Sequence, residues 1–306
     1  MAQVLETRRG LWAVDKVQLV YLAVTGAFLV AYFTDLPDAS VLLAVHIVVA
    51  LLILAAARSE SRAAWYFRHW YPLPLVSFCY REMAVLIPAV WGRSFDGFLA
   101  DLDFAIWHAN PTVWLERIQT PNFTEFLEIV YALFVPAVLL IPVILWAKRR
   151  YKDFRYCAFL IAVGFLVSYV GYMLVPARGP RFLLAPLQHH PLEGRWFFHW
   201  MRSTLDQLES AHYDCFPSGH VELTILAWSL SRQISKRLGW TYFVYTLCII
   251  FATVYLRYHY TVDLAAGALA AAFLIRKAPG FYRRLGGAEL AESGSKVSGR
   301  EEPVGT

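Results

Sequence analysis

The run FRYCAFLIAVGFLVSYVGYMLV, residues 154–175, carries a single charged side chain, Arg155, in 22 positions. A helix that crosses a bilayer needs about 20 apolar residues, because each residue adds about 1.5 Å to the span of a hydrocarbon core about 30 Å thick. This run is therefore long enough and apolar enough to cross as one helix. The whole chain of 306 residues shares its character, since 58% of it is hydrophobic and 17% is charged. We predict an integral membrane protein.

Seven further segments have a similar composition, so the predicted fold is an all-α polytopic helical bundle with about eight spans. They are residues 17–33, 39–57, 72–91, 126–147, 221–235, 240–256 and 262–275. Segment 72–91 has Arg81 and Glu82 at its centre, so it either crosses the membrane or forms a re-entrant element. This pair would serve either in substrate binding or as an ion pair inside the bundle. If the basic turns lie inside, the parity of the crossings requires 72–91 to cross.

The predicted organisation is a single domain with three parts. Residues 1–57 form an N-terminal transmembrane hairpin, residues 58–276 form the membrane core, and residues 277–306 form a disordered cytoplasmic tail rich in Gly, Ser, Glu, Lys and Arg. The 28 basic residues exceed the 23 acidic ones by too little to indicate a nucleic-acid partner. The preference for cations on the cytoplasmic side of a membrane explains the excess, and we expect a plasma (inner) membrane location.

The sequence CFPSGH, Cys215–His220, opens one of the apolar runs. Pro217 suits the first position of a helix, so free N–H groups, including that of Gly219, would point outward at an anion. Ser218 adds a hydroxyl donor, and Gly219 would let a phosphate approach the backbone closely. His220 can give a proton to a departing oxygen near neutral pH. This sequence therefore predicts a phosphate site with its own acid.

A second group of ionisable side chains follows the next apolar hairpin, in the sequence RYHYTVD, Arg257–Asp263. His259 and Asp263 are four residues apart and would share one face of a helix. If Asp263 holds one ring nitrogen of His259, the other nitrogen is left unprotonated and can act as nucleophile or base. Arg257 adds a planar fork of donors suited to phosphoryl oxygens.

The sequence PARGPR, residues 176–181, places Arg178 and Arg181 at the end of another run. The predicted topology puts these arginines on the non-cytoplasmic face, which is usually poor in arginine. We therefore favour phosphate contact over interfacial anchoring for both side chains. The same topology brings the CFPSGH and RYHYTVD sequences to that face, as a shared active site requires.

These three sequences, in this order, resemble the motifs of the type 2 phosphatidic acid phosphatase superfamily of integral membrane enzymes. Pro217–His220 matches the second motif in full, and His259 with Asp263 matches the third. The resemblance covers roughly residues 65–276. It implies that His259 is a nucleophile that forms a phosphohistidine, that His220 is the acid for the leaving group, and that Asp263 is the orienting carboxylate.

The sequence departs from the phosphatase pattern at two places, and at both it resembles the inositol phosphorylceramide synthase (inositolphosphotransferase-like) branch of the superfamily. Ala252–Thr253 replaces a serine-arginine pair five residues before His259, and Gly171 and Leu174 occupy the positions where the first-motif lysine would stand. That branch transfers a headgroup phosphate between lipids. It implies a phospholipid donor and a lipid alcohol acceptor, in a sphingolipid type of metabolism. The alternative is a lipid phosphate or polyprenyl pyrophosphate phosphatase, a hydrolase of the same superfamily.

No metal and no other cofactor is expected, because the arginines would supply the positive charge that a metal ion gives to other phosphoryl-transfer enzymes. The histidines between residues 176 and 216 have no zinc-ligand spacing, and the four cysteines suit buried small apolar residues. A transporter or structural bundle that kept the motifs as relics is disfavoured, because His220, His259 and Asp263 are all present.

Overall fold

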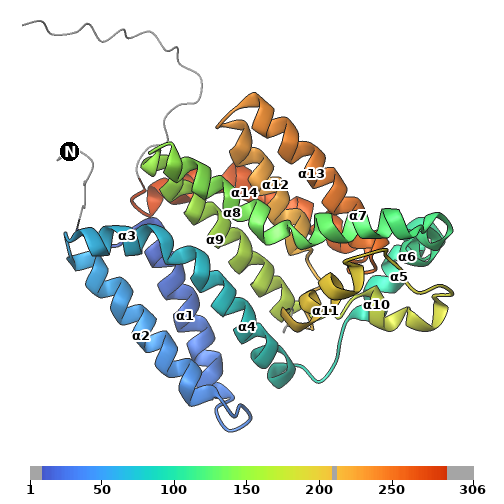
Figure 1. The fold of residues 1–306 in the computed structure, drawn as a ribbon. Coiled ribbons are helices and arrows are strands. Elements are labelled where there is room, and N and C mark those ends of the chain that lie inside the picture. Colours follow the sequence, from blue (N-terminus) through green and yellow to red (C-terminus); the bar gives the residue numbers. More distant parts are fainter. Residues whose placement is uncertain (1–8, 209–211, 288–306) are drawn as a thin grey trace, which may run out of the picture.

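The protein is seen here as a computed structural model that describes residues 9–208 and 212–287 (Figure 1). Within those ranges the regular structure is helical, with one isolated bridge between Ala177 and Asp214. The α-helices are α1 (Ala13–Ala31), α2 (Ala39–Arg58), α3 (Arg62–Trp70), α4 (Pro72–Val90), α5 (Asp96–Trp107), α6 (Pro111–Trp114), α7 (Pro121–Ala132), α8 (Phe134–Ala147), α9 (Tyr151–Leu174), α10 (Pro180–Leu183), α11 (Phe198–Leu208), α12 (Gly219–Arg232), α13 (Lys236–Tyr255) and α14 (Thr261–Arg284). The all-α polytopic prediction is confirmed.

The number of spans is close to the predicted eight. Six helices of the described chain are each long and apolar enough to cross a membrane, namely α1, α2, α4, α9, α13 and α14. Helices α7 and α8 form a seventh candidate, bent by 44°. Pro136 explains the bend, because it has no N–H to donate to the Ala132 carbonyl four residues earlier. Helix α12 has only 14 residues, about 21 Å at about 1.5 Å per residue, so it is shorter than a full span.

Segment 72–91 forms one continuous helix, α4, which is among the candidate spans. Its two central charges do not pair with each other. The buried Glu82 carboxylate lies 2.8 Å from the Nε2 atom of His46 in α2, whereas Arg81 is exposed. Glu82 therefore takes part in a structural pair that ties the N-terminal hairpin to α4.

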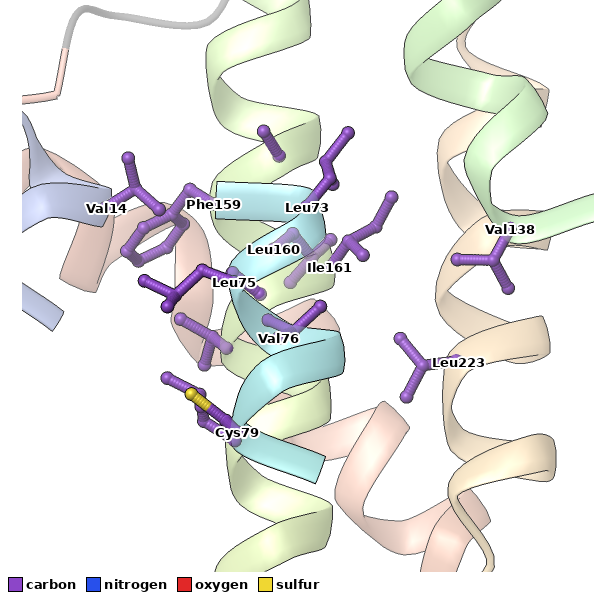
Figure 2. Packing of buried hydrophobic residues seen from close by; sticks show 14 of the residues in the cluster. Val14, Leu73, Leu75, Val76, Cys79, Val138, Phe159, Leu160, Ile161 and Leu223 are labelled. Carbon is purple, nitrogen blue, oxygen red and sulfur yellow. The ribbon is translucent and has the colours of Figure 1, made fainter. Parts of the chain in front are cut away.

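Helix α9 lies at the centre of the bundle, with side chains of α1, α4, α8 and α12 packed around it (Figure 2). Its residues Phe159, Leu160 and Ile161 are almost fully buried. Gly164 lets α12 approach, because a Cβ atom there would lie 2.8 Å from Leu226 Cδ1. Small residues allow such close packing in membranes, where the lipid gives no hydrophobic drive for helices to associate. The four cysteines are free thiols, and three of them are buried.

One predicted boundary differs from the structure. Helix α14 continues to Arg284, so residues 277–284, which we assigned to the tail, belong to the last helix. Buried Ala278 and Tyr282 explain this continuation, since the Tyr282 ring packs on Phe159 of α9 at 4.9 Å. The remainder of the predicted tail, residues 288–306, lies outside the described residues.

Candidate active site

Three chain segments meet at one end of the bundle, each beside a helix end. The first follows α9, the second opens α12, and the third joins α13 to α14. Backbone hydrogen bonds connect them: Cys215 N–H to the Ala177 carbonyl at 3.1 Å, Ser218 N–H to the Asp263 carbonyl at 3.0 Å, and Arg181 N–H to the Arg257 carbonyl at 3.0 Å. The fold therefore brings the three predicted motifs together.

The two predicted catalytic histidines are neighbours. His259 Nε2 lies 3.4 Å from His220 Nδ1, and the His259 side chain is 3% exposed. His259 Nδ1 lies 2.8 Å from the carbonyl oxygen of Cys215. Because a carbonyl oxygen can only accept, Nδ1 carries the proton and Nε2 keeps its lone pair. The potential nucleophilic atom therefore points at the potential acid.

Asp263 lies beside the same imidazole but is not its nearest partner. Its Oδ2 atom is 3.5 Å from His259 Nδ1, and it accepts hydrogen bonds at 2.8 Å from the Tyr260 N–H and at 2.8 Å from the Cys215 thiol. The Cys215 carbonyl fixes the ring, and the carboxylate stands close enough to stabilise a positive charge on it. Asp263 also holds the turn that leads into α14.

Cys215, His259 and Asp263 form a compact group whose potential ligand atoms lie within 4.8 Å of one another. Burial, together with the adjacent Asp263, raises the pKa of the Cys215 thiol well above its ordinary value. The thiol therefore keeps its proton and donates it to Asp263. A metal ion would have to displace this proton and the one on His259 Nδ1, so the chemistry of these donors favours a hydrogen-bonded group.

Two rings that no sequence motif indicated, Tyr131 and Phe134, form an aromatic wall against His220. The His220 ring stacks on Tyr131 with 4.5 Å between centroids, and it lies 4.3 Å from Phe134. Tyr131 in turn stacks on Tyr258 at 4.1 Å. Tyr131 and Phe134 flank the break between α7 and α8 at Leu133, so the bend in this candidate span presents both rings to the histidine.

Of the first-motif arginines, Arg178 lies on the loop after α9 and Arg181 lies in the short helix α10. Arg178 is exposed, and its guanidinium lies 4.2 Å from the centroid of the Phe182 ring. Arg181 forms an ion pair with Asp206 at 2.7 Å, and its guanidinium lies 5.0 Å from the Tyr258 ring. The Tyr258 ring is thus shared between Arg181 and the aromatic wall behind His220. Two stacked rings, Tyr258 and Tyr131, therefore connect Arg181 to His220.

Arg257 is buried in a different set of contacts. Its guanidinium donates to Glu116 at 2.9 Å, to the Gln188 side chain at 2.8 Å and to the His190 carbonyl at 2.7 Å. Residue 257 has a left-handed backbone, with φ of 69°, in the turn between α13 and α14. The Arg257 guanidinium is therefore occupied by residues of the 176–216 segment and by Glu116. A phosphate would have to replace these partners.

Two carboxylates of α5, Asp96 and Asp103, hold the site in place. Buried Asp96 accepts hydrogen bonds from the Arg178 and Gly179 N–H groups at 2.8 and 2.7 Å, and from the Tyr260 hydroxyl at 3.1 Å. Asp103 accepts from the main chain of Thr261 at 2.8 Å and caps the N-terminus of α14. Helix α5 thereby joins the first motif to the third.

Ser218 and Gly219 lie at the start of α12, but Pro217 does not occupy the helical position predicted for it. The helix begins at Gly219, and Ser218 is its N-cap, with its Oγ atom accepting from the Val221 N–H at 3.4 Å. Pro217 therefore precedes the helix and does not occupy its first position. Serine is a favoured N-cap because its hydroxyl satisfies a free N–H group. A Cβ atom at Gly219 would collide with the Tyr172 hydroxyl.

Gly267 of α14 gives a direct test of this packing. A Cβ atom at Gly267 would collide with the Ser218 carbonyl, whereas one at Gly280 of the same helix would meet nothing within 4 Å. We expect Gly267→Ala to lower stability by about 1–3 kcal/mol and to reduce turnover, because it pushes α14 from the start of α12. Gly280→Ala should change stability by no more than about 1 kcal/mol, in the stabilising direction. Thermal unfolding and activity assays in detergent test both variants. Equal losses of stability and turnover in Gly267→Ala and Gly280→Ala would contradict the packing.

Comparisons with known proteins agree with this geometry. A relative from Dictyostelium discoideum, described as a PA-phosphatase related-family protein, is 31% identical over 125 residues, which is 40% of this chain and 22% of the relative. The chain thus matches only a small part of that protein. No solved structure matches the chain significantly. The family pattern described as the PAP2 superfamily matches residues 99–276, more than half of the chain and all three motifs, so the chain belongs to the PAP2 superfamily.

Proposed function

We propose that this protein is an integral membrane phosphotransferase that moves a phosphoryl or phosphoalcohol group from a phospholipid to a lipid alcohol. Membership of the superfamily supports a lipid phosphatase or phosphotransferase. The observation that carries the mechanism is the contact of 3.4 Å between His259 Nε2 and His220 Nδ1. A phosphorus atom attacked by His259 would have His220 beside its leaving oxygen.

In the first step, the lone pair of His259 Nε2 forms a bond to phosphorus, and the bond from phosphorus to the leaving alcohol oxygen breaks. Protonated His220 gives its proton to that oxygen. In the second step, the acceptor hydroxyl attacks phosphorus, His220 takes the hydroxyl proton, and the P–N bond breaks. His259 Nε2 recovers its lone pair, and both histidines return to their starting states. Asp263 stabilises the positive charge that His259 carries in between.

The phosphoryl oxygens need positive partners during both steps. We assign these contacts to Arg178 and Arg181, together with the main chain and hydroxyl at Ser218 and Gly219. The exposure of Arg178 and the position of Arg181 over Tyr258 support this assignment. For Arg257, the ion pair with Glu116 favours a role in holding the 176–216 segment over the predicted phosphate contact.

Transfer instead of hydrolysis requires that water be kept from the phosphohistidine. The Tyr131 and Phe134 rings that cover His220 favour a lipid hydroxyl over water, as do the departures from the phosphatase motifs. The second candidate is a lipid phosphate or polyprenyl pyrophosphate phosphatase. It is supported by the description of the Dictyostelium relative as PA-phosphatase related.

Purified protein, given a phospholipid donor and a panel of lipid alcohols that includes ceramide and diacylglycerol, should form mainly the transferred product. Products are resolved by mass spectrometry, with the donor alone and the acceptor alone as controls. An acceptor that competes with water should lower the release of free phosphate or free headgroup phosphate. Release at one unchanged rate, with and without every acceptor, would make the protein a phosphatase.

We also propose that the active site faces the non-cytoplasmic side of the plasma (inner) membrane. The basic segment Lys148–Lys152 covers the turn between α8 and α9 and the start of α9, at the end of α9 opposite the first motif. Basic turns are usually retained in the cytoplasm, which supports a non-cytoplasmic location for the motifs. A cysteine introduced at exposed Glu193, next to Gly194, should be labelled by an impermeant thiol reagent in intact cells, and a cysteine at Lys152 should stay unlabelled.

A further inference from the structure

A second candidate binding site lies at the far end of α12 from the catalytic histidines. The turn between α12 and α13 is at the top of the view in Figure 1, away from α10 and α11. A cavity of about 460 Å³ opens there, lined by Trp228, Arg232, Lys236, Gly239, Trp240 and Phe243. Arg232 is twelve residues beyond His220 on one helix, or about 18 Å at about 1.5 Å per residue. The cavity is therefore separate from the phosphoryl-transfer site.

The lining of this cavity has two cations, three aromatic rings and no acidic side chain. Arg232 and Lys236 are both exposed, and neither forms an ion pair within the described part of the chain. The Arg232 guanidinium lies 5.5 Å from the centroid of the Trp228 ring. Gly239 makes room for this side chain, since a Cβ atom there would lie 2.8 Å from Arg232 Cγ. The two positive charges are thus held at a hollow without an internal counter-ion.

The surroundings add further positive charge. Arg150 donates a hydrogen bond at 3.4 Å to the Gln233 carbonyl, which places the turn between α8 and α9 beside the cavity. That turn carries Lys148 and Arg149 in addition to Arg150, and the first turn of α9 adds Lys152, while Asp153 of α9 is paired with Arg150. Clusters of basic residues at the ends of membrane helices attract anionic headgroups.

An apolar track leads away from the cavity along α13. Trp240, Val244 and Leu247 are 60%, 55% and 50% exposed, and their spacing of four and three residues puts them on one face of the helix. Trp240 belongs to both the cavity and this track. Free phosphate would use only the cations, whereas a lipid would use the cations through its headgroup and the track through its acyl chains. The track therefore favours a lipid.

We propose that this cavity binds an anionic phospholipid, with its phosphate at Arg232 and Lys236 and an acyl chain along Trp240, Val244 and Leu247. The bound lipid would belong to the leaflet opposite the active site. It is therefore a ligand of the protein and not a substrate. The occupied site would hold the α12–α13 turn in place, at the other end of the helix that begins beside His220.

The test uses the purified full-length protein in neutral detergent, titrated with short-chain phosphatidylglycerol and followed by native mass spectrometry and thermal unfolding. The protein should bind phosphatidylglycerol and gain thermal stability, while phosphatidylcholine should bind much more weakly. The double variant Arg232→Gln/Lys236→Gln should bind phosphatidylglycerol about tenfold more weakly, because each basic residue near an anionic surface contributes to attraction. Arg283→Gln/Arg284→Gln removes two exposed cations at the end of α14 and should leave binding unchanged.

Three results would overturn the proposal. They are equal binding of the two lipids by the unmodified protein, equal loss in the two double variants, and displacement of phosphatidylglycerol by an equal concentration of inorganic phosphate. The first and third of these do not depend on any variant. Turnover measured on the same double variants shows that each has kept its fold.

Discussion

Replacing His259 by alanine is expected to reduce turnover by about four orders of magnitude or more, because it removes the atom that bonds to phosphorus. The structure supports this choice of nucleophile over His220. The Nδ1 atom of His259 is committed to the Cys215 carbonyl at 2.8 Å, so the lone pair is at Nε2. The unmodified protein, quenched during turnover, should carry phosphorus on the peptide containing His259, and the variant should carry none.

His199→Ala is the matched control, because this histidine of α11 has its side chain 72% exposed and contacts Glu193 and the ring of the neighbouring Phe198. It should keep full activity and the same adduct at His259. The unfolding temperature of His259→Ala in detergent separates loss of chemistry from loss of fold. A folded His259→Ala protein that still turned over, or an adduct on another residue, would contradict the assignment.

The helical membrane fold could be predicted from sequence because each apolar run of about 20 residues indicates a membrane helix by itself. An apolar run such as residues 154–175 determines a membrane helix whatever surrounds it. The shape of segment 126–147 was less accessible, since a single proline, Pro136, turns an expected straight span into the bent pair α7 and α8. The end of α14 was missed for a different reason. Its last residues are charged, and only the contact between Tyr282 and α9 explains their helical continuation.

The pairing of the histidines followed from the motifs, but the groups that support the pair did not. Asp96 meets the N–H groups of Arg178 and Gly179 more than eighty residues further along the chain, and no local pattern shows which backbone a carboxylate will reach. Arg257 illustrates the same limit. Next to His259 it suggested a phosphate ligand, yet Glu116 lies close enough to bind its guanidinium. Spacing indicates the chemistry a residue can perform, and only the tertiary contacts show which partner it has.

The second large effect is expected at His220, and its size should depend on the substrate. The ring stacks on Tyr131 and presents Nδ1 to His259 at 3.4 Å, a position from which it can protonate an oxygen that leaves the same phosphorus atom. An alkoxide is a poor leaving group and needs that proton, whereas a nitrophenolate does not. His220→Ala should therefore slow formation of the adduct from a phospholipid by about 10²–10⁴-fold and from a nitrophenyl ester much less.

The same variant should also show which step limits turnover. With a nitrophenyl ester, His259 can still be phosphorylated, but no base remains to take the proton from the acceptor hydroxyl. A burst of nitrophenolate, about equal to the amount of enzyme, should therefore be followed by slow turnover, and the adduct at His259 should accumulate. Equal losses for both leaving groups, with neither a burst nor an accumulated adduct in a folded protein, would show that His220 does not transfer the proton.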